Sequence, residues 1–508
     1  MAKPQVVASG QTRPGFVDVS DAIANGDVEG ARQRLQRFTP EERQLLEAQI
    51  GKRAAERVFR LAAGGKPRAA KQGRVILLPG LMGSQLDSVD ANGDGDRVWV
   101  NLARIFTGRM ADLRLKNDGS SPPPPPTVLL HGVYPAVYLP MILELHQRWH
   151  TLPLGYDWRK NIDESADMLA AVVRNWGQDE PIHLLVHSMG GLVARRFIAR
   201  HPQVWASMND PNLERGGRLL MLGTPNRGSF AIVLALSGEE KLVKTLDKID
   251  LRHNRAELVA ILNTFAGSYQ LLPSPLVDLG DDHRRLFDAA TWGALPVHQG
   301  LLDQGQSFQK DLDPVIDAPR LLFVAGHDQE TPCAVTVTAP GKFQYRNTQD
   351  GDGRVPHSLG LLPGVKTYYI KEKHGDLAKN ETVLAAVHDL LRTGSTTLLP
   401  ENPPRLRARV TGPYPKRKEA PPAEVGPLLV EAAQRPRGVS LRPELAAARL
   451  EALATADYLG TPGPGPRVRS LPKRRTRARK AAAGTRKTSA RSAKGGKRPA
   501  RRAGKKAN

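Results

Sequence analysis

Short runs of aliphatic residues recur along the middle of the chain, and stretches with helical spacing separate them. The runs are apolar at every position, which is typical of strands whose two faces are both covered by helices. They lie at residues 75–78, 182–186, 219–222 and 321–325. After the last run, residues 380–392 place apolar side chains three and four positions apart, as in a helix with one buried face. Strands that alternate with helices predict an α/β fold with a mostly parallel central sheet flanked by helices.

Residues 1–70 precede the α/β region and carry the signals of short helices. Thr39 is followed by Pro40 and, three residues on from Thr39, by Glu42, which predicts a helix that begins with a capping box. We expect these residues to form a helical N-terminal segment. The α/β domain then covers residues 71–393.

The basic charge of the chain, +23 in total, is concentrated at its C-terminus. Residues 394–472 are rich in proline and predict a linker with one helix over about 443–459. Residues 473–508 hold 16 Lys and Arg and no acidic residue, which leaves 58 basic and 51 acidic residues in the rest. Such a segment has almost nothing to bury and is predicted to be a disordered Lys/Arg-rich tail. Its charge suits an anionic membrane surface or nucleic acid as a partner.

Cysteine usage and hydropathy exclude several classes of protein. Cys333 is the only cysteine, so an intrachain disulfide and a cluster of metal-bound thiolates are excluded. The N-terminus lacks the apolar stretch of a signal peptide, and no apolar run is long enough to cross a bilayer. We expect a cytoplasmic protein that reaches a membrane only at its periphery. The oligomeric state is open.

The strongest local signal is the sequence IHLLVHSMGGLVARR, in which an aliphatic strand runs into Ser188 and then into a helix. A sharp turn between strand and helix lifts a serine hydroxyl out at the top of the sheet, close to backbone N–H groups at the helix N-terminus. Gly190 matches the second glycine of the pattern G-x-S-x-G, whereas Val186 stands in place of the first. We interpret Ser188 as a nucleophile. The alternative is a serine in an ordinary loop between strand and helix.

A nucleophilic serine needs backbone donors for the oxyanion that forms when it attacks a carbonyl group. One is expected directly after the serine, at Met189. The second commonly comes from the loop after an early strand, and here the strand at 75–78 is followed by Pro79, Gly80 and Leu81. We therefore predict an oxyanion hole made by the N–H groups of Leu81 and Met189.

The serine also needs a base and an acid, which in this type of fold follow it in the order Ser, Asp, His. His374, which lies after a predicted strand and before the last helix, is the first candidate for the base, and His357 is its rival. Asp352 and Asp350 lie in a glycine-flanked loop, whereas Asp328 follows the strand at 321–325. Position alone does not separate Asp352 from Asp328 as the acid.

Taken in order, several motifs resemble those of the lecithin:cholesterol acyltransferase family, over roughly residues 74–392. The resemblance implies an α/β-hydrolase fold in which Ser188 is the nucleophile, His374 the base, and Asp352 rather than Asp328 the acid. It also implies that the N–H groups of Leu81 and Met189 are the oxyanion donors. The motifs are LLPGLMGSQL, DRVWVNLARIF, LGYDWRKN, HLLVHSMGG, LGTPNRGS, SYQLLPS and DGDGRVPHS followed by HGDL.

The resemblance further implies insertions that cover the site, a lid over about 87–138 and a cap over about 228–318. Secreted members of the family close the lid with a disulfide, which this chain cannot form. Residue 354 is Arg where the family often has Thr. Some residues of the lid segment are candidates for contact with lipid, and the alternative is that they pack internally; they are Trp99, Leu102, Ile105 and Phe106.

The motif LGYDWRKN places aromatic and charged side chains at a predicted strand end, where α/β sheets meet their ligands. We expect Tyr156 and Trp158, with Trp99 from the lid, to contact substrate. We expect Asp157 and Arg159 to brace the loop.

No metal ion or cofactor is required by this chemistry. Asp90, Asn92 and Asp94 begin like a calcium loop, but Asn101 stands where the loop needs a bidentate Glu. We interpret the segment as an Asx-rich turn.

These residues predict serine-dependent acyl transfer on lipid esters through an acyl-enzyme. The resemblance favours an O-acyltransferase that passes the acyl group to a lipid hydroxyl. The first alternative is a lipase, phospholipase or esterase that passes it to water. A remote alternative is a nucleic-acid-associated protein that acts through residues 473–508.

Overall fold

The structure, a computed structural model, describes residues 14–402 and the strand at 467–468. Within that range it leaves out residues 65–69, 94, 100, 102–103, 106, 177–179 and 209–215. The helix expected at 443–459 and the basic tail at 473–508 lie outside the described residues.

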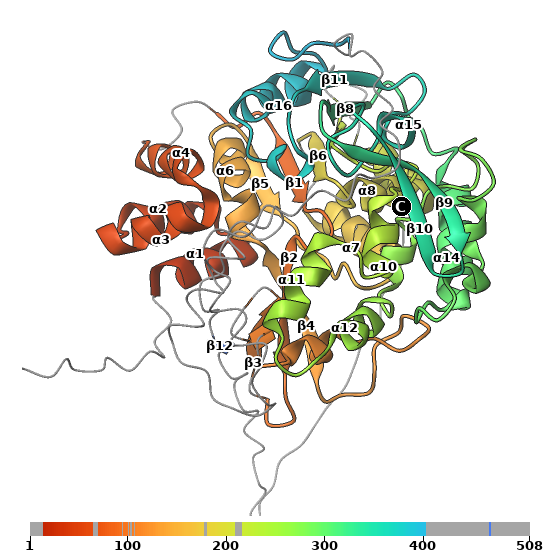
Figure 1. The fold of residues 1–508 in the computed structure, drawn as a ribbon. Coiled ribbons are helices and arrows are strands. Elements are labelled where there is room, and N and C mark those ends of the chain that lie inside the picture. Colours follow the sequence, from red (N-terminus) through yellow and green to blue (C-terminus); the bar gives the residue numbers. More distant parts are fainter. Residues whose placement is uncertain are drawn as a thin grey trace, which may run out of the picture. The chain divides into compact units, whose positions relative to one another are not determined.

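Six parallel strands form the central sheet, in the order β11-β8-β7-β6-β1-β5 (Figure 1). Four of them are the aliphatic runs of the sequence. The parallel sheet with helices on both sides confirms the predicted α/β-hydrolase fold. The strands are β1 (Arg74–Leu78), β5 (His150–Pro153), β6 (Ile182–His187), β7 (Leu219–Leu222), β8 (Leu321–Gly326) and β11 (Lys366–Ile370).

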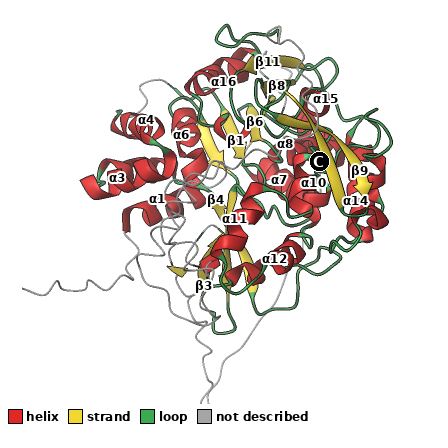
Figure 2. Cartoon of the chain, in the orientation of Figure 1, coloured by secondary structure: helices red, strands yellow, loops and turns green. Residues whose placement is uncertain are grey.

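The strands are apolar throughout because each face of the sheet is covered. In β1, Val75 and Leu77 pack in one cluster with α6 (Pro135–His146) and α16 (Glu381–Thr393), whereas Ile76 and Leu78 pack in another with α7 (Ile162–Asn175) and α8 (Gly190–Arg200). Successive side chains of a strand point to opposite faces, so a strand between two helix layers needs no polar position. Figure 2 shows these helices around the sheet.

Four helices precede the sheet and pack on α6. Buried side chains of the four helices belong to the same apolar cluster as Val75 and Leu77, and the ion pair between Arg57 and Glu144, at 2.8 Å, ties the last of them to α6. The predicted capping box at Thr39 is confirmed. The helices are α1 (Pro14–Ala24), α2 (Val28–Gln36), α3 (Pro40–Ile50) and α4 (Lys52–Ala63).

The segment expected to be a lid, residues 87–138, buries some of its apolar residues and exposes others, among them Leu129 and Leu130 on β4. Three parts of it belong to strands of a small antiparallel sheet in the order β12-β3-β2-β4, and its end is the start of α6. Trp99 and Ile105 have no exposed surface and join the core, so the internal-packing alternative holds for them. Leu102 and Phe106 lie outside the described residues. The elements are β2 (Ser84–Val89), β3 (Gly95–Trp99), η1 (Arg109–Leu113), β4 (Thr127–Val133) and β12 (Arg467–Val468).

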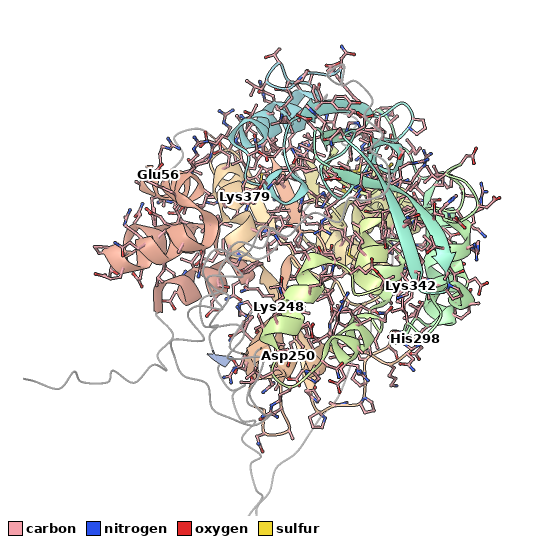
Figure 3. The ribbon with its side chains drawn as sticks, viewed as in Figure 1. Glu56, Lys248, Asp250, His298, Lys342 and Lys379 are labelled. Carbon is pink, nitrogen blue, oxygen red and sulfur yellow. The ribbon has the colours of Figure 1, made fainter. Side chains whose placement is uncertain are left out.

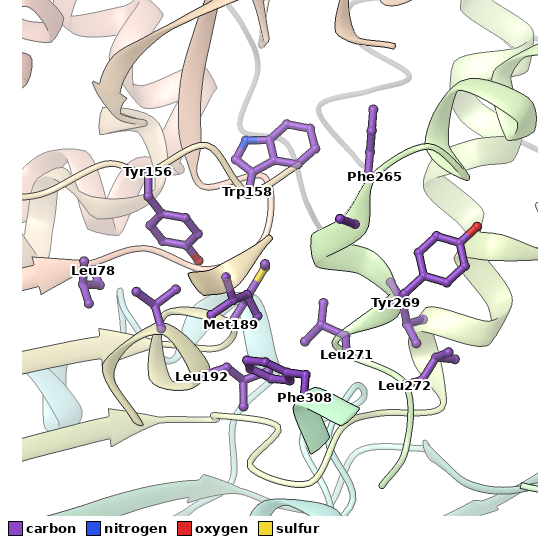
Figure 4. Close-up of a cluster of buried hydrophobic side chains, with 14 of the residues drawn as sticks. Leu78, Tyr156, Trp158, Met189, Leu192, Phe265, Tyr269, Leu271, Leu272 and Phe308 are labelled. Atoms are coloured by element: carbon purple, nitrogen blue, oxygen red, sulfur yellow. The ribbon is translucent and has the colours of Figure 1, made fainter. Parts of the chain in front are cut away.

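The segment expected to be a cap, residues 228–318, consists mainly of short helices. Its helix α11 (Lys241–Ile249) buries Leu242, Val243 and Leu246 on one side. Other side chains of the cap join the cluster around Met189, which Figure 4 shows. The remaining cap helices are α10 (Ala231–Leu236), α12 (Arg255–Leu262), α13 (Ala266–Tyr269), η2 (Arg284–Phe287), η3 (Ala289–Trp292) and α14 (Gln299–Leu312).

The chain after β8 forms a hairpin of β9 (Thr331–Ala339) and β10 (Lys342–Thr348) before it returns to the sheet. Three short helices complete the fold, namely α9 (Pro202–Ser207), α15 (His357–Gly360) and η4 (His374–Asp376). Of the helices that the structure describes, none is long and apolar enough to cross a membrane.

Candidate active site

Ser188 lies at the sharp turn between β6 and α8. Its φ of 55° is in the left-handed region, which a residue other than glycine adopts only where the surroundings enforce it. The turn is crowded: a Cβ atom on Gly190 would lie 2.5 Å from the backbone oxygen of Pro79, and one on Gly191 would lie 2.1 Å from Oγ1 of Thr224. The two glycines therefore allow strand, helix and neighbouring loops to approach closely enough to form the turn.

The structure brings His374 and Asp352 into line with this serine. Nε2 of His374 lies 2.8 Å from Oγ of Ser188, and Nδ1 lies 2.7 Å from Oδ2 of Asp352. Because the ionised carboxylate only accepts hydrogen bonds, Nδ1 carries the proton, which leaves Nε2 of a neutral ring free to accept one from the serine. The arrangement can therefore take a proton from the hydroxyl as the oxygen attacks.

Asp352 is held in its ionised form although it is buried. Its Oδ1 accepts hydrogen bonds from the N–H groups of Arg354 and Val355, at 2.9 and 2.8 Å. Burial raises the pKa of Asp352, but the charge and hydrogen bond of His374 and the two N–H groups outweigh it and hold the pKa below its usual value. The carboxylate is thus ready to stabilise an imidazolium at His374.

The rival candidates lie elsewhere. Asp328 is ion-paired with Lys371, and this contact keeps the pKa of Asp328 below its ordinary value. The ring of His357 bonds through Nε2 to the backbone oxygen of Gly326, at 2.9 Å. Asp350 accepts the backbone N–H of His357 through its carbonyl oxygen. None of these side chains is hydrogen-bonded to the serine or to its histidine in the described part of the chain.

The expected oxyanion donors flank the serine. Leu81 lines the same cavity as Ser188, and a Cβ atom on Gly80 would lie 2.9 Å from Cβ of Ser188, so only glycine lets this loop come so close. Met189 is buried at the start of α8. Within the described residues, neither the N–H of Leu81 nor that of Met189 donates to a protein acceptor. Both are therefore available to an oxyanion.

A cavity of about 410 Å³ lies beside the serine. The cap provides most of its apolar wall, and α11 turns its buried side toward the cavity. This wall can receive an acyl chain because it offers carbon atoms and few hydrogen-bonding groups. The apolar residues that the cap contributes are Ala231, Ile232, Ala235, Leu236, Leu242, Val243, Leu246, Leu262, Phe265 and Leu271.

The N-terminal helices also contribute to the cavity, which sequence reasoning did not predict. Gln49, Ile50 and Gly51, at the junction of α3 and α4, line it together with Ser188. Oε1 of Gln49 is buried and has no hydrogen-bond partner among the described residues. Nothing in the local sequence distinguishes this junction from any other turn between helices, because its role depends on packing against a segment far along the chain.

Charged groups line another part of the cavity. Arg354 pairs with Glu240 at 2.7 Å, and Lys379 pairs with Asp376 at 3.0 Å. Lys379, labelled in Figure 3, lies in the loop between η4 and α16. Arg354, which occupies a position where Thr is common in the resembled family, thus links the acid loop to the cap.

The aromatic residues expected to contact substrate lie behind the site. The ring of Trp158 packs edge-on against Trp99, at 5.4 Å between centroids, and both are fully buried and do not line the cavity. Tyr156 is also buried, and its hydroxyl donates to the backbone oxygen of Pro79 at 3.0 Å. Nε1 of Trp99 donates to the backbone oxygen of Met82 and Nε1 of Trp158 to that of Ser84, so the three side chains support the segment around Leu81 rather than contact the cavity. The reason is that the motif follows β5 at the edge of the sheet, next to the small antiparallel sheet.

The charged pair of the same motif braces its loop, as expected. Nη2 of Arg159 lies 2.6 Å from Oδ2 of Asp157, and Nη1 donates to the backbone oxygen of Leu113 at 2.8 Å. The pair is therefore part of the support behind the cavity.

No group of three or more His, Cys, Asp and Glu side chains in the described part of the chain is arranged to hold a metal ion. In the calcium-like segment, the N–H of Asn92 donates to Oδ1 of Asp90 at 2.8 Å, which is an Asx turn.

Comparison with protein families agrees with this geometry. Residues 149–383 match the family model of lecithin:cholesterol acyltransferase. The chain carries a domain of that family. The lecithin:cholesterol acyltransferase family domain contains the serine, the acid and the histidine of the candidate site, and it supports an enzyme that acts on lipid esters.

No curated protein matches the sequence. Among solved structures, the chain is similar to the Tle4–Tli4 complex, with 14% identity and a TM-score of 0.42 over 64% of this chain and 98% of the other. It is also similar to the mature form of the Bacillus licheniformis lipase BlEst2, with 16% identity and a TM-score of 0.32 over 65% and 96%. Similarity with such a low identity and TM-score carries no argument here, and the description of the fold rests on the strand order.

Proposed function

We propose that this chain is a serine-dependent acyltransferase that moves the acyl group of a lipid ester to the hydroxyl group of a second lipid. The observation that carries the proposal is the hydrogen-bonded line from Asp352 through His374 to Ser188, which ends beside a cavity with an apolar wall. The family domain supports the class of substrate.

In the proposed first step, His374 takes the proton of Ser188 at Nε2 while Oγ attacks the carbonyl carbon of the ester. The negative oxygen of the tetrahedral intermediate accepts hydrogen bonds from the N–H groups of Leu81 and Met189. Asp352 stabilises the imidazolium and keeps its orientation. His374 then returns the proton to the leaving alkoxide, and the acyl group remains on Ser188.

In the second step, the acceptor hydroxyl gives its proton to His374 and attacks the acyl carbon, which regenerates the free serine. An alcohol and water follow the same route, and they compete for the same acyl-enzyme. A site that excludes water favours the alcohol. Both the cap and the N-terminal helices contribute residues to the cavity wall, and this shared cover is the feature of this chain that favours transfer.

Vesicles that contain phosphatidylcholine and a diacylglycerol provide the test. The full chain should convert the diacylglycerol to triacylglycerol with little release of free fatty acid, as measured by mass spectrometry. The Ser188→Ala variant is the matched control and should yield neither product. Release of free fatty acid alone would show a lipase and contradict the transferase, and no Ser188-dependent product from lipid esters would contradict the whole proposal.

A further inference from the structure

A chain of hydrogen bonds joins the oxyanion loop to the base through Tyr138 and His187, which also line the cavity beside Ser188. The N–H of Gly80 donates to Oη of Tyr138 at 2.8 Å, and Oη of Tyr138 lies 2.8 Å from Nδ1 of His187. Nε2 of His187 lies 2.9 Å from the backbone oxygen of His374. Gly80 directly precedes Leu81, so the hydrogen-bond chain has one end at the oxyanion loop and the other at His374.

The direction of every bond in this chain follows from its two ends. A carbonyl oxygen only accepts, so Nε2 of His187 must carry a proton and donate it to His374. In a neutral ring, Nδ1 is then an acceptor, and it receives the hydroxyl proton of Tyr138. The same hydroxyl oxygen accepts the N–H of Gly80. Each group therefore has one role, and reversing any bond would leave a buried polar atom without a partner.

Burial keeps His187 in the required neutral form. Its side chain is almost completely covered, and its ring lies 5.0 Å from the ring of His374. Burial is the main cause that lowers the pKa of His187, to about 3, and the hydrogen bond to the backbone oxygen of His374 and the charge of Asp352 only partly offset it. A neutral His187 places no positive charge beside the imidazolium that forms at His374.

We propose that His187 and Tyr138 are positioning residues, which hold the backbone of His374 and the loop of Gly80 and Leu81 in one geometry through a directed hydrogen-bond chain. The inference rests on the proposed function of Ser188, His374 and the oxyanion loop. Neither residue exchanges a proton with substrate. Their effect is on the orientation of groups that do, and loss of orientation by about 1 Å can cost on the order of a hundredfold in rate.

The first variant is Tyr138→Phe, which removes one hydroxyl and leaves the ring. With p-nitrophenyl butyrate, kcat should fall by about ten- to a hundredfold while KM changes by less than about threefold, because ground-state contacts with the ester remain. Tyr269→Phe is the matched control: Tyr269 is also buried, donates to the backbone oxygen of Asn263 at 2.7 Å and accepts the N–H of His298 at 3.3 Å. It lies outside the cavity wall, so its loss should lower thermal stability without changing kcat.

The second variant, His187→Leu, is combined with the first. If both residues act through one chain, the double variant loses no more activity than the worse single variant. Losses that multiply, or a folded Tyr138→Phe variant with the kcat of the parent, would overturn the proposal.

The proton on His187 provides a measurement that does not depend on turnover or on the folding of a variant. In the parent chain, 15N NMR of labelled histidine should show a neutral ring at position 187 with the proton on Nε2 from pH 8 down to pH 5. A proton on Nδ1, or a charged ring at pH 5, would contradict the proposal even if the enzyme were active. Conversely, absence of turnover in the parent with this proton pattern intact would refute the proposed function and leave the hydrogen-bond chain standing.

Discussion

Replacing Asp352 by Asn tests which carboxylate orients the base. The variant keeps the shape of the side chain and removes its charge, which lies 2.7 Å from Nδ1 of His374. Unit charges about 4 Å apart at an effective dielectric constant of about 20 attract each other by about 4 kcal/mol. At about 1.36 kcal/mol for each factor of ten, the imidazolium formed in the transition state loses stabilisation worth about 10³ in kcat. An amide that turns its N–H toward the ring also favours the wrong tautomer, which can bring the loss to about 10⁴.

The assay is kcat for p-nitrophenyl butyrate, and Asp328→Asn is the matched control. Asp328 has a φ of 61°, which Asn tolerates, and its carboxylate faces Lys371 rather than a histidine of the site. Its variant should stay within about twofold of the parent, since a surface ion pair contributes little. A larger loss for Asp328→Asn than for Asp352→Asn would refute the assignment of the acid.

The stability of the Asp352→Asn variant should depend on pH in a defined direction. The pKa of Asp352 is lowered in the folded chain, so its ionisation stabilises the fold above the unfolded pKa of about 3.9. That contribution is lost as the pH falls through the lowered folded value. Urea unfolding should therefore show a larger difference between parent and variant at pH 7 than at pH 3, and an equal difference at both would contradict the pKa direction.

Three further predictions concern the cavity, the serine turn and the tail. Leu246→Trp should fill the acyl cavity and lower the ratio of palmitate to butyrate ester turnover by about tenfold or more, whereas the volume-conserving Leu246→Met should leave the ratio nearly unchanged. Gly191→Ala should lower the free energy of unfolding by about 1–3 kcal/mol, measured in urea, because its Cβ would collide with Thr224. We propose that residues 473–508 bind an anionic membrane surface through their charge. Deleting them should leave butyrate ester turnover unchanged and abolish salt-sensitive binding to anionic vesicles and to DNA. Binding that survives the deletion would show that the folded part of the chain carries the binding surface.

The parts of the fold that could be predicted are those in which local sequence and tertiary structure impose the same requirement. The aliphatic run at 182–186 suits a strand between two helix layers, although a buried helix segment can look similar, and the glycines after Ser188 are required by the turn itself. The capping box at Thr39 is encoded within four residues. For the acid, however, position did not separate Asp352 from Asp328, and only the family resemblance favoured Asp352 before the hydrogen bond to His374 was visible.

The parts that could not be predicted depend on contacts between distant segments. Trp99 was expected near substrate because aromatic residues suit both a lipid contact and a core, and only its packing against Trp158 places it in the core. Ile50 and Gly51 line the cavity although no motif surrounds them. The link from Tyr138 to His187 joins residues 49 positions apart, and the sequence around Tyr138 carries no sign of it.

The central claim is that Ser188 forms an acyl-enzyme, and covalent trapping tests it most directly. The full chain is treated with a long-chain p-nitrophenyl alkylphosphonate, whose phosphorus accepts the serine oxygen and releases p-nitrophenol, and is then analysed by intact mass and peptide mapping. The account predicts one adduct per chain, located on Ser188, that is absent from Ser188→Ala and forms at least about a hundredfold more slowly in His374→Ala. An adduct on another residue, or a folded parent chain that forms none, would contradict it.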